Sequence, residues 1–327
     1  MSYKIHFYSL LFISTFLFTI SIKSFAADAI TFTLDNDLFI ASDEGYTNGI
    51  YGSWYYIGRG KDQPNSSRLV WPLKWSMPDT DGELSINAYS IGQSMYTPSD
   101  ILASNPDPDD IPYAGILFLS NTYIVSYGSF VDSITTTIGI IGPESGAEST
   151  QKFFHEITDS DQPQGWDYQL ENEVIFKLTR GRMWRNWISE NGNFDLLSGV
   201  DMGIGTLESA INAGVAIRVG QQLSTSYISG ILTPSRTSNF IAVNNGWFAY
   251  LMIGGRLIAN HIVLNGNTYR DSRSIDLDNT HVTLTSGLAY SWGDLSVTLA
   301  YSDISFKDEN ISTASRYGTL TVGWFFR

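Results

Sequence analysis

The segment GTLTVGWFF (318–326) alternates polar or small residues with large apolar residues, in a repeat of two. The apolar set is Leu320, Val322, Trp324 and Phe326, and the residues between them are Thr319, Thr321, Gly323 and Phe325. Such a repeat is typical of a β-strand with one apolar face. Two kinds of structure contain strands of this type, the wall of a membrane barrel and the edge of a soluble sandwich.

Further segments with strand patterns, bounded by turn residues, recur along the rest of the chain. Together with the last segment they predict twelve strands, at 29–37, 46–58, 84–96, 113–127, 132–142, 172–181, 194–206, 209–221, 246–266, 280–291, 294–305 and 315–326. We expect 246–266 to be one long strand with a bend or bulge at Gly254-Gly255. An even number of strands is typical of single-chain bacterial barrels.

The first residues carry the pattern of a secretory signal peptide at 1–26. Lys4 precedes an apolar run at 8–22, and Ser24-Phe25-Ala26 is a small-x-small cleavage site. The alternative is a membrane anchor, but the run is shorter than the roughly 20 residues that a spanning helix needs. We therefore expect a mature barrel domain at 27–327.

Composition narrows the class of protein further. There is no cysteine, aromatic residues make up 14% of the chain, and 29 glycines are present. The formal charge of −14 disfavours nucleic acid, which is bound mainly through Lys and Arg. An exported, strand-rich and aromatic-rich chain without disulfides indicates an all-β fold, a transmembrane antiparallel β-barrel in a Gram-negative outer membrane. The final strand, apart from the trailing Arg327, is similar to the C-terminal signature of outer-membrane proteins.

Topology predicts where the polar connections lie. If both termini are periplasmic, the connections 38–45, 97–112 and 143–171 face the cell exterior. The last of these is a short non-strand segment that contains His155. The hairpin of the first two strands carries Asn36-Asp37 and Thr47, so these residues and His155 are expected at one outward-facing rim. Two opposite connections, 59–83 and 222–245, are longer than ordinary periplasmic turns.

Several motifs occur in an order that is more specific than any one of them. They are LDNDLF (34–39), GYTNGIYG (45–52), GQSMYTPSD (92–100), IPYAG (111–115), GIIGPESGAESTQKFFH (139–155) and WDYQLENE (166–173). This ordered set resembles the lipid A 3′-O-deacylase family of outer-membrane enzymes. The resemblance covers the N-terminal half well, and the C-terminal half matches as barrel strands.

The resemblance implies a twelve-stranded barrel that hydrolyses the ester of the 3′ acyloxyacyl chain of lipid A, or lipopolysaccharide, with Ca²⁺. It places His155 on the catalytic histidine, and it assigns further catalytic positions to Asn36, Asp37, Thr47 and Gln151. Asn36, Asp37 and Asp161 are the expected metal ligands. Two positions depart from the family: Asp161 stands where a glutamate is found, and Ala103 or a neighbour where a lysine is found.

The residue types suit ester hydrolysis. Histidine is the side chain best placed to act as a base near neutral pH. No G-x-S-x-G elbow is present, so water activated by His155 is the simpler nucleophile. Carboxylate and amide oxygens are the ligands that Ca²⁺ prefers, and the ion would polarise the ester carbonyl.

Two other functions stay open from the sequence. One is an outer-membrane phospholipase, although His155-Glu156-Ile157 has no serine two residues after the histidine. The other is a non-enzymatic barrel, a pore or adhesin, which the missing lysine favours. We expect the remaining histidines of the mature chain, His261 and His281, to belong to the barrel wall.

Overall fold

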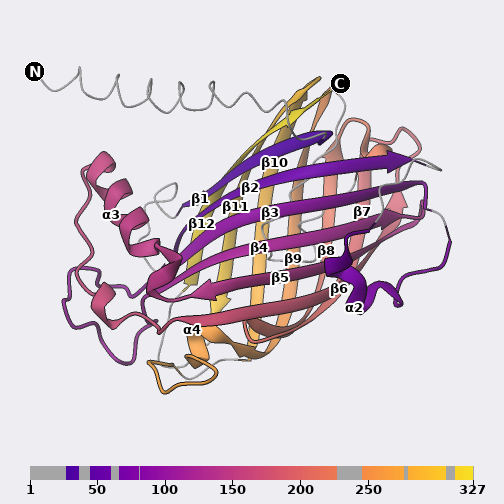
Figure 1. Cartoon of the computed structure of the whole chain (residues 1–327). Coiled ribbons are helices and arrows are strands. Elements are labelled where there is room, and N and C mark those ends of the chain that lie inside the picture. Colours follow the sequence, from indigo (N-terminus) through magenta and orange to yellow (C-terminus); the bar gives the residue numbers. More distant parts are fainter. Residues whose placement is uncertain are drawn as a thin grey trace, which may run out of the picture.

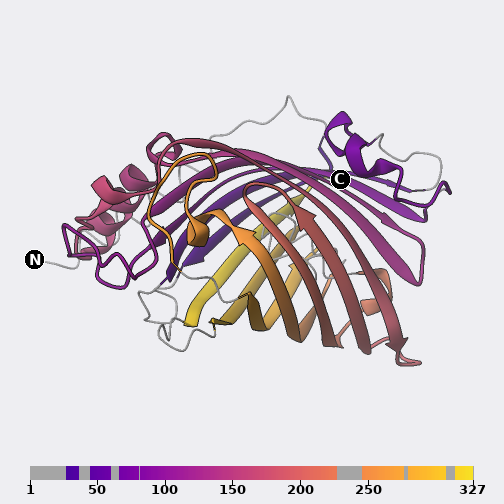
Figure 2. The same ribbon diagram turned by 90° about the horizontal axis from the view of Figure 1, so that it is seen from below.

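A computed structural model describes residues 27–36, 45–59, 66–80, 82–226, 245–275, 279–306 and 314–326. Twelve antiparallel strands close into one barrel in which neighbours in the sequence are neighbours in the sheet (Figures 1 and 2). The strands are β1 (Ala29–Asn36), β2 (Gly45–Arg59), β3 (Leu84–Thr97), β4 (Ala114–Ser126), β5 (Phe130–Ile141), β6 (Glu173–Ile188), β7 (Phe194–Ile204), β8 (Glu208–Gly220), β9 (Gly246–His261), β10 (Thr280–Trp292), β11 (Leu295–Phe306) and β12 (Ala314–Phe325). The predicted barrel and its twelve strands are confirmed.

The segment that ends the chain closes the barrel. In β12, Leu320 pairs with Leu34 of β1 on one side and with Leu299 of β11 on the other. Its threonines are buried, and Thr321 shares a 2.9 Å hydrogen bond with Thr33. Its apolar face is open to the outside, with Val322 37% and Trp324 49% exposed. The alternation therefore belongs to a barrel wall and not to the edge of a sandwich.

Two strand ends and the position of one bulge differ from the prediction. β6 runs on to Ile188, seven residues past the predicted end at 181. The long strand at 246–266 is a single strand, β9, but it ends at His261 and a short helix, α4 (Ile262–Asn265), follows. The expected bulge at Gly254-Gly255 is wrong, because both glycines pair in regular register with β8 and the irregularity lies near Ala259.

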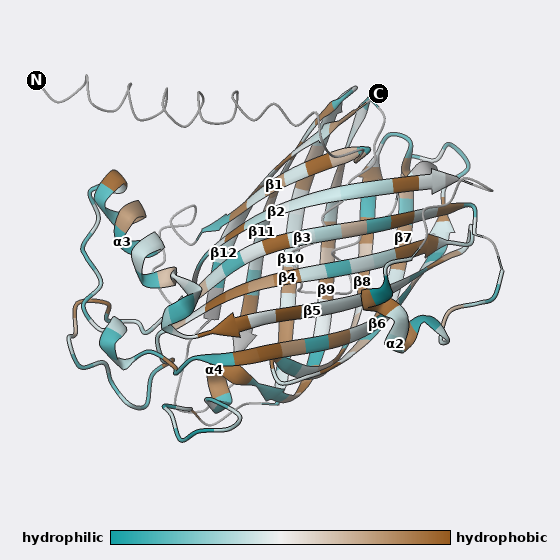
Figure 3. Cartoon of the chain, viewed as in Figure 1, coloured by the Kyte–Doolittle hydropathy of each residue, from teal (hydrophilic) through white to brown (hydrophobic). Residues whose placement is uncertain are grey.

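The outer wall is apolar over much of its height. The exposed, outward-facing residues include Leu117, Leu119, Ile138, Phe176, Val200, Ile217, Leu251, Ile253, Leu284 and Leu299. In Figure 3 apolar segments recur along the strands of the facing wall. An apolar band of this kind is what the hydrocarbon of a membrane requires of a barrel. Within the described residues, no helix has the length and hydropathy to cross a membrane.

Buried apolar clusters lie near both ends of the barrel. We call the end where β1 begins and β12 ends the proximal end, and the opposite end the distal end. Near the proximal end a buried cluster is formed by Met183, Leu197, Ala216, Leu223, Phe248, Met252 and Ala289. Leu223 belongs to the short helix η6 (Leu223–Thr225), and Arg185 and Arg218 bind its backbone carbonyls. Near the distal end α4 packs against Ile116, Ile141 and Ile175.

Two helical segments lie outside the strands, at opposite ends of the barrel. α3 (Ala147–Thr158) extends from the distal end, and α2 (Trp71–Lys74) lies near the proximal end in both views (Figures 1 and 2). The segment near 143–171, predicted only as a non-strand segment, contains η4 (Pro143–Ser145), α3 and η5 (Trp166–Tyr168). The long connection after β2 likewise contains η3 (Arg68–Val70) and α2.

Candidate active site at the distal end of the barrel

Glycines set the path from β5 into α3. Gly142 has φ 106° and Gly146 has φ 72°, a backbone region that favours glycine over other residues. At Gly142 an added Cβ would lie 2.6 Å from the backbone nitrogen of Asn172. The chain therefore turns sharply after the strand, passes through η4 and starts the helix beside the wall.

The start of α3 fits closely against β3 and β4. A Cβ on Gly115 would lie 2.2 Å from the Ser145 hydroxyl and 2.3 Å from the Cβ of Ala147. From β3, Gln93 Nε2 donates a 2.7 Å hydrogen bond to the carbonyl of Ser145. Ala147 itself is buried with Met95, Tyr113 and Trp166. This packing fixes the helix on the outer face of the barrel.

The helix presents two different faces. Gln151 and His155 are four residues apart, so they lie on one side of a helix, and they are 2% and 9% exposed. Phe153 and Ile157 are 58% and 45% exposed, and they define an apolar outer side. The polar pair thus faces protein while the apolar pair faces outward.

Trp166 holds Gln151. The indole Nε1 donates a 2.7 Å hydrogen bond to Gln151 Oε1, and the indole ring packs on Tyr113 with centroids 4.9 Å apart. This contact fixes the orientation of the amide. Within the described residues the other amide atom, Gln151 Nε2, is buried and has no hydrogen-bond partner. A buried donor without a partner is costly, so a hydrogen-bond acceptor placed beside it would be favourable.

His155 is held by the turn that follows the helix. Asp159 adopts a left-handed conformation (φ 58°), and Ser160 N donates to the His155 carbonyl at 2.9 Å. The chain then returns so that the carbonyl oxygen of Asp161 lies 2.5 Å from His155 Nδ1. A carbonyl oxygen only accepts, so Nδ1 carries the hydrogen and donates it. In the neutral imidazole, Nε2 is then the free base.

The other predicted site residues are placed to different degrees. Asn36 is the last residue of β1, at the distal end, where it pairs with Asn48 and Gly318. Thr47 lies in β2, but its side chain is outside the described residues, as is all of Asp37. The structure therefore brings together Gln151, His155 and Asp161, and it places Asn36 at the same end of the barrel.

The described residues do not by themselves form a metal site. No group of three or more His, Asp or Glu side chains able to hold a metal ion occurs in the described ranges. The carboxylate of Asp161 is exposed, and its contact with His155 is through the backbone. The oxygen donors of Asn36 and Asp161 have the chemistry that Ca²⁺ prefers, but a complete site would need Asp37 as well.

Sequence reasoning missed the residues that position the pair. The motifs contain Trp166, Gln93 and Gly115, but the sequence alone assigned no role to them. Trp166 had a usable signal, because a buried indole needs an acceptor for its N–H and polar helix residues lie nearby in sequence. No sequence signal could have predicted the contact between His155 and the carbonyl of Asp161, since a residue of any type supplies a backbone carbonyl.

We expect Trp166→Phe to lower the rate of the reaction that Gln151 supports while leaving the barrel intact. The substitution keeps an aromatic ring against Tyr113 but removes the Nε1–H donor, which leaves Gln151 free to rotate. The loss of one buried hydrogen bond corresponds to about 1 kcal/mol, or several-fold in rate. Turnover of the two purified proteins measures it, and Trp184→Phe, on the outer wall 37% exposed, is the control. Equal turnover by all three would contradict this role of Trp166.

Comparison with known proteins assigns the family. The family model described as "Outer membrane protein LpxR" matches residues 10–326. The chain belongs to the LpxR family. This assignment confirms the resemblance to the lipid A 3′-O-deacylase family, and it extends the match through the C-terminal half, where the motifs were weak.

Solved structures agree with the LpxR fold. LpxR from Salmonella typhimurium superposes with a TM-score of 0.73 at 15% identity, over 91% of this chain and 100% of that chain. The β domain of the Bordetella autotransporter BrkA gives a TM-score of 0.46 at 10% identity, over 92% of this chain and 99% of that chain, which adds nothing to the assignment. Comparison with curated proteins gave no match.

Proposed function

We propose that this member of the LpxR family is an outer-membrane esterase that removes the 3′-linked acyloxyacyl chain of lipid A. The observation that carries the proposal is His155, buried on the polar side of α3 with Nδ1 donating to the Asp161 carbonyl. A histidine held in this way has one nitrogen free for proton transfer. Family membership supplies the ester substrate.

His155 Nε2 would act first as a base and then as an acid. It takes a proton from water as the water oxygen attacks the ester carbonyl, which gives a tetrahedral intermediate. The intermediate collapses, the bond to the sugar oxygen breaks, and His155 returns the proton to that oxygen. The products are a free acyloxyacyl acid and a 3′-hydroxyl group. Gln151 Nε2 is the donor available to an oxygen of the substrate.

Calcium belongs to the proposal as the ion that Asn36, Asp37 and Asp161 would hold. When bound, it would supply positive charge near the ester oxygen, where negative charge develops. Thr47 would position water or substrate at the same rim. The role of each of these residues is a hypothesis for mutagenesis.

The place of α3 suits a substrate that lies in a membrane. The start of the helix packs on the outside of the wall, and Phe153 and Ile157 further along present an apolar surface. A lipid in the surrounding leaflet would therefore reach His155 sideways, without entering the lumen. With both termini periplasmic, the distal end meets the outer leaflet, where lipid A lies.

We expect chelation of divalent ions to abolish deacylation, and added Ca²⁺ to restore it. Without the ion, only the neutral donors Gln151 and Thr47 would face the negative charge that develops on the ester oxygen, and no full positive charge would stabilise it. The assay is release of the acyloxyacyl acid from lipid A by the purified barrel, in chelator and after calcium is returned. Full activity in excess chelator would remove the metal from the mechanism.

A pore would conduct ions across a bilayer. The side chains inside this barrel lead us to expect no ion conductance. The cluster around Phe248 and the cluster around α4 place apolar side chains inside the barrel near each end, and polar contacts fasten η6 at the proximal end. We expect the barrel, inserted in a planar bilayer, to give no steady current steps. Long-lived open steps in the protein as purified would favour the pore.

Substrate choice tests the function against the phospholipase. The purified barrel is incubated with lipid A and, separately, with a diacyl phospholipid, and the products are identified by mass spectrometry. Loss of an acyloxyacyl group from lipid A, with the phospholipid unchanged, is the expected result. Fatty acid released from the phospholipid alone would replace the proposal with the phospholipase.

A further inference from the structure

The connection between β2 and β3 forms a second structured surface, at the proximal end. Residues 66–80 include η3 and α2 and pack on the outer wall. Val70 and Met77 are buried against Tyr123 of β4 and Ile134 of β5, and the carbonyl of Leu69 accepts a 2.7 Å hydrogen bond from Thr136. We call residues 66–80 the proximal segment.

Charged residues of the wall fasten the proximal segment. Arg180 of β6 donates to the Ser76 hydroxyl at 3.0 Å. Arg180 and Arg182 both bind Asp132 of β5, at 2.7 and 2.6 Å, and Asp132 is fully buried. These three charges lie on the outward side of strands in a membrane barrel, where they would be costly if bare. Only Arg180 is bonded to the segment, through Ser76, and Arg182 stays 35% exposed beside it. The bonds from Arg180 and Thr136 anchor the segment to the wall.

The segment leaves a cationic and aromatic surface on the outside. Trp71 is 77% and Trp75 82% exposed. Arg68 and Lys74 form no ion pair with any carboxylate in the described part of the chain. Lys74 Nζ lies 4.3 Å from the centre of the Tyr123 ring. Burial lowers the pKa of its ammonium, against the charge of Asp79, so a bound anion would be favourable for it.

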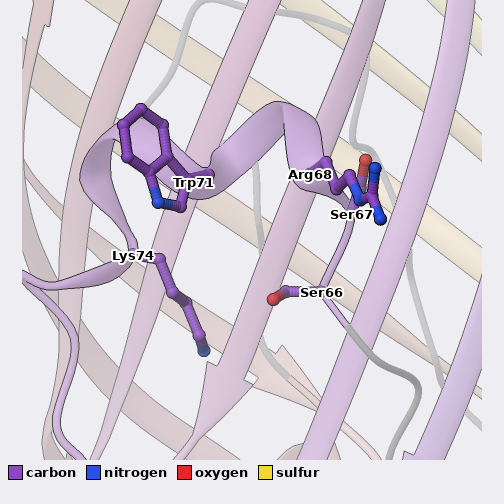
Figure 4. A pocket seen from close by; sticks show the side chains of 5 residues that line it. All are labelled: Ser66, Ser67, Arg68, Trp71 and Lys74. Carbon is purple, nitrogen blue, oxygen red and sulfur yellow. The ribbon is translucent and has the colours of Figure 1, made fainter.

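A hollow of about 480 Å³ lies among these side chains. Its lining residues are Ser66, Ser67, Arg68, Trp71 and Lys74. In Figure 4 the Ser66 hydroxyl and the Lys74 ammonium lie below the helical turn, with Trp71 at one side and Arg68 at the other. Ser67 Oγ accepts from Leu69 N at 3.1 Å, which leaves its O–H free to donate. The hollow therefore offers two positive charges and two hydroxyl donors beside an exposed indole.

We propose that this hollow binds the phosphate of a glycerophospholipid in the leaflet around the proximal end of the barrel. Arg and Lys with hydroxyl donors are the usual partners of phosphate oxygens. Tryptophan prefers the level of the lipid headgroups, and the neighbouring barrel wall is apolar, as acyl chains require. The attraction is local, because the whole chain is acidic, with 33 Asp and Glu against 19 Lys and Arg.

The proposal does not depend on the deacylase activity. The hollow is at the proximal end and His155 is at the distal end, so the two sites sit on opposite leaflets. The orientation of the barrel decides which leaflet, and hence which class of lipid, meets the hollow. With periplasmic termini it is the inner leaflet of the outer membrane, which makes a phospholipid, and not lipid A, the expected ligand.

Native mass spectrometry of the whole barrel tests the proposal. The protein is released from detergent after titration with phosphatidylglycerol or with diacylglycerol, which has the same chains and no phosphate. The test variant is Arg68→Gln with Lys74→Gln. The control variant, Arg270→Gln with Arg316→Gln, removes two exposed cations elsewhere. A heat-dependent shift in gel migration checks that each barrel is closed.

We expect wild type and control to retain phosphatidylglycerol. The test variant, which lacks both cations of the hollow, should bind it at least about tenfold more weakly. The charge reversal Arg68→Glu with Lys74→Glu should weaken it further. Equal retention of phosphatidylglycerol by wild type and the test variant would overturn the proposal. Equal retention of diacylglycerol and phosphatidylglycerol by wild type would overturn it as well.

Discussion

Replacement of His155 by Gln is expected to reduce deacylation of lipid A by about 10²–10⁴-fold, the range typical for loss of a general base. Glutamine is similar in size and can still donate to the Asp161 carbonyl, so the turn after α3 should remain. What is lost is the basic Nε2 that the hydrogen bond at Nδ1 leaves free. The effect should appear in kcat more than in KM, because the base acts in the transition state.

The control for His155→Gln lies on the same helix. Glu156→Gln changes an exposed neighbour that contacts nothing in the proposed mechanism, and it should keep wild-type turnover. Both variants should give closed barrels in the gel-migration assay. If His155→Gln, correctly folded, turned over lipid A as wild type does, His155 would not be the base.

The second large effect is expected at Gly115, which never touches the substrate in this account. In Gly115→Ala the new Cβ would overlap both Ser145 and Ala147, so the start of α3 must move away from the wall. Overpacking of this kind costs about 1–3 kcal/mol. A displacement of catalytic groups by about 1 Å can lower a rate by on the order of 100-fold.

Gly255→Ala provides a matched control, because an added Cβ there meets no atom within 4 Å. Both glycines lie in barrel strands, and only one has α3 against it. We expect Gly255→Ala to keep full activity, Gly115→Ala to lose most of it, and both barrels to stay closed. Full activity in Gly115→Ala would show that the close fit of the helix is not needed for the site.

The strands could be predicted from the sequence because a barrel wall imposes a repeat of two and needs turns between strands. The end of β6 was missed since Arg182 and Arg185 look like loop residues. In the structure Arg182 pairs with buried Asp132 of β5, and Arg185 points into the lumen and binds η6. Both arginines therefore have partners on other elements, which allows them to stand in a strand. Local sequence contains neither partner.

Distant contacts also explain why α4, and the contacts that hold α3, could not be predicted from local sequence. The apolar run IVL (262–264) fits a strand as well as a helix, and its packing into the distal lumen decides between them. For α3 the motif identified Gln151 and His155, but the resemblance alone could not say how they are held. That information lies in the glycine turns, in the indole of Trp166 and in a backbone carbonyl, none of which is a chemical motif.

The most direct test of the account is the lipid A mass spectrum of a Gram-negative host that produces this protein, beside hosts that produce His155→Ala and Glu156→Gln. We expect loss of a mass that matches one acyloxyacyl group with wild type and with Glu156→Gln, and unchanged lipid A with His155→Ala. Unchanged lipid A in all three hosts, with each barrel folded in the outer membrane, would contradict it.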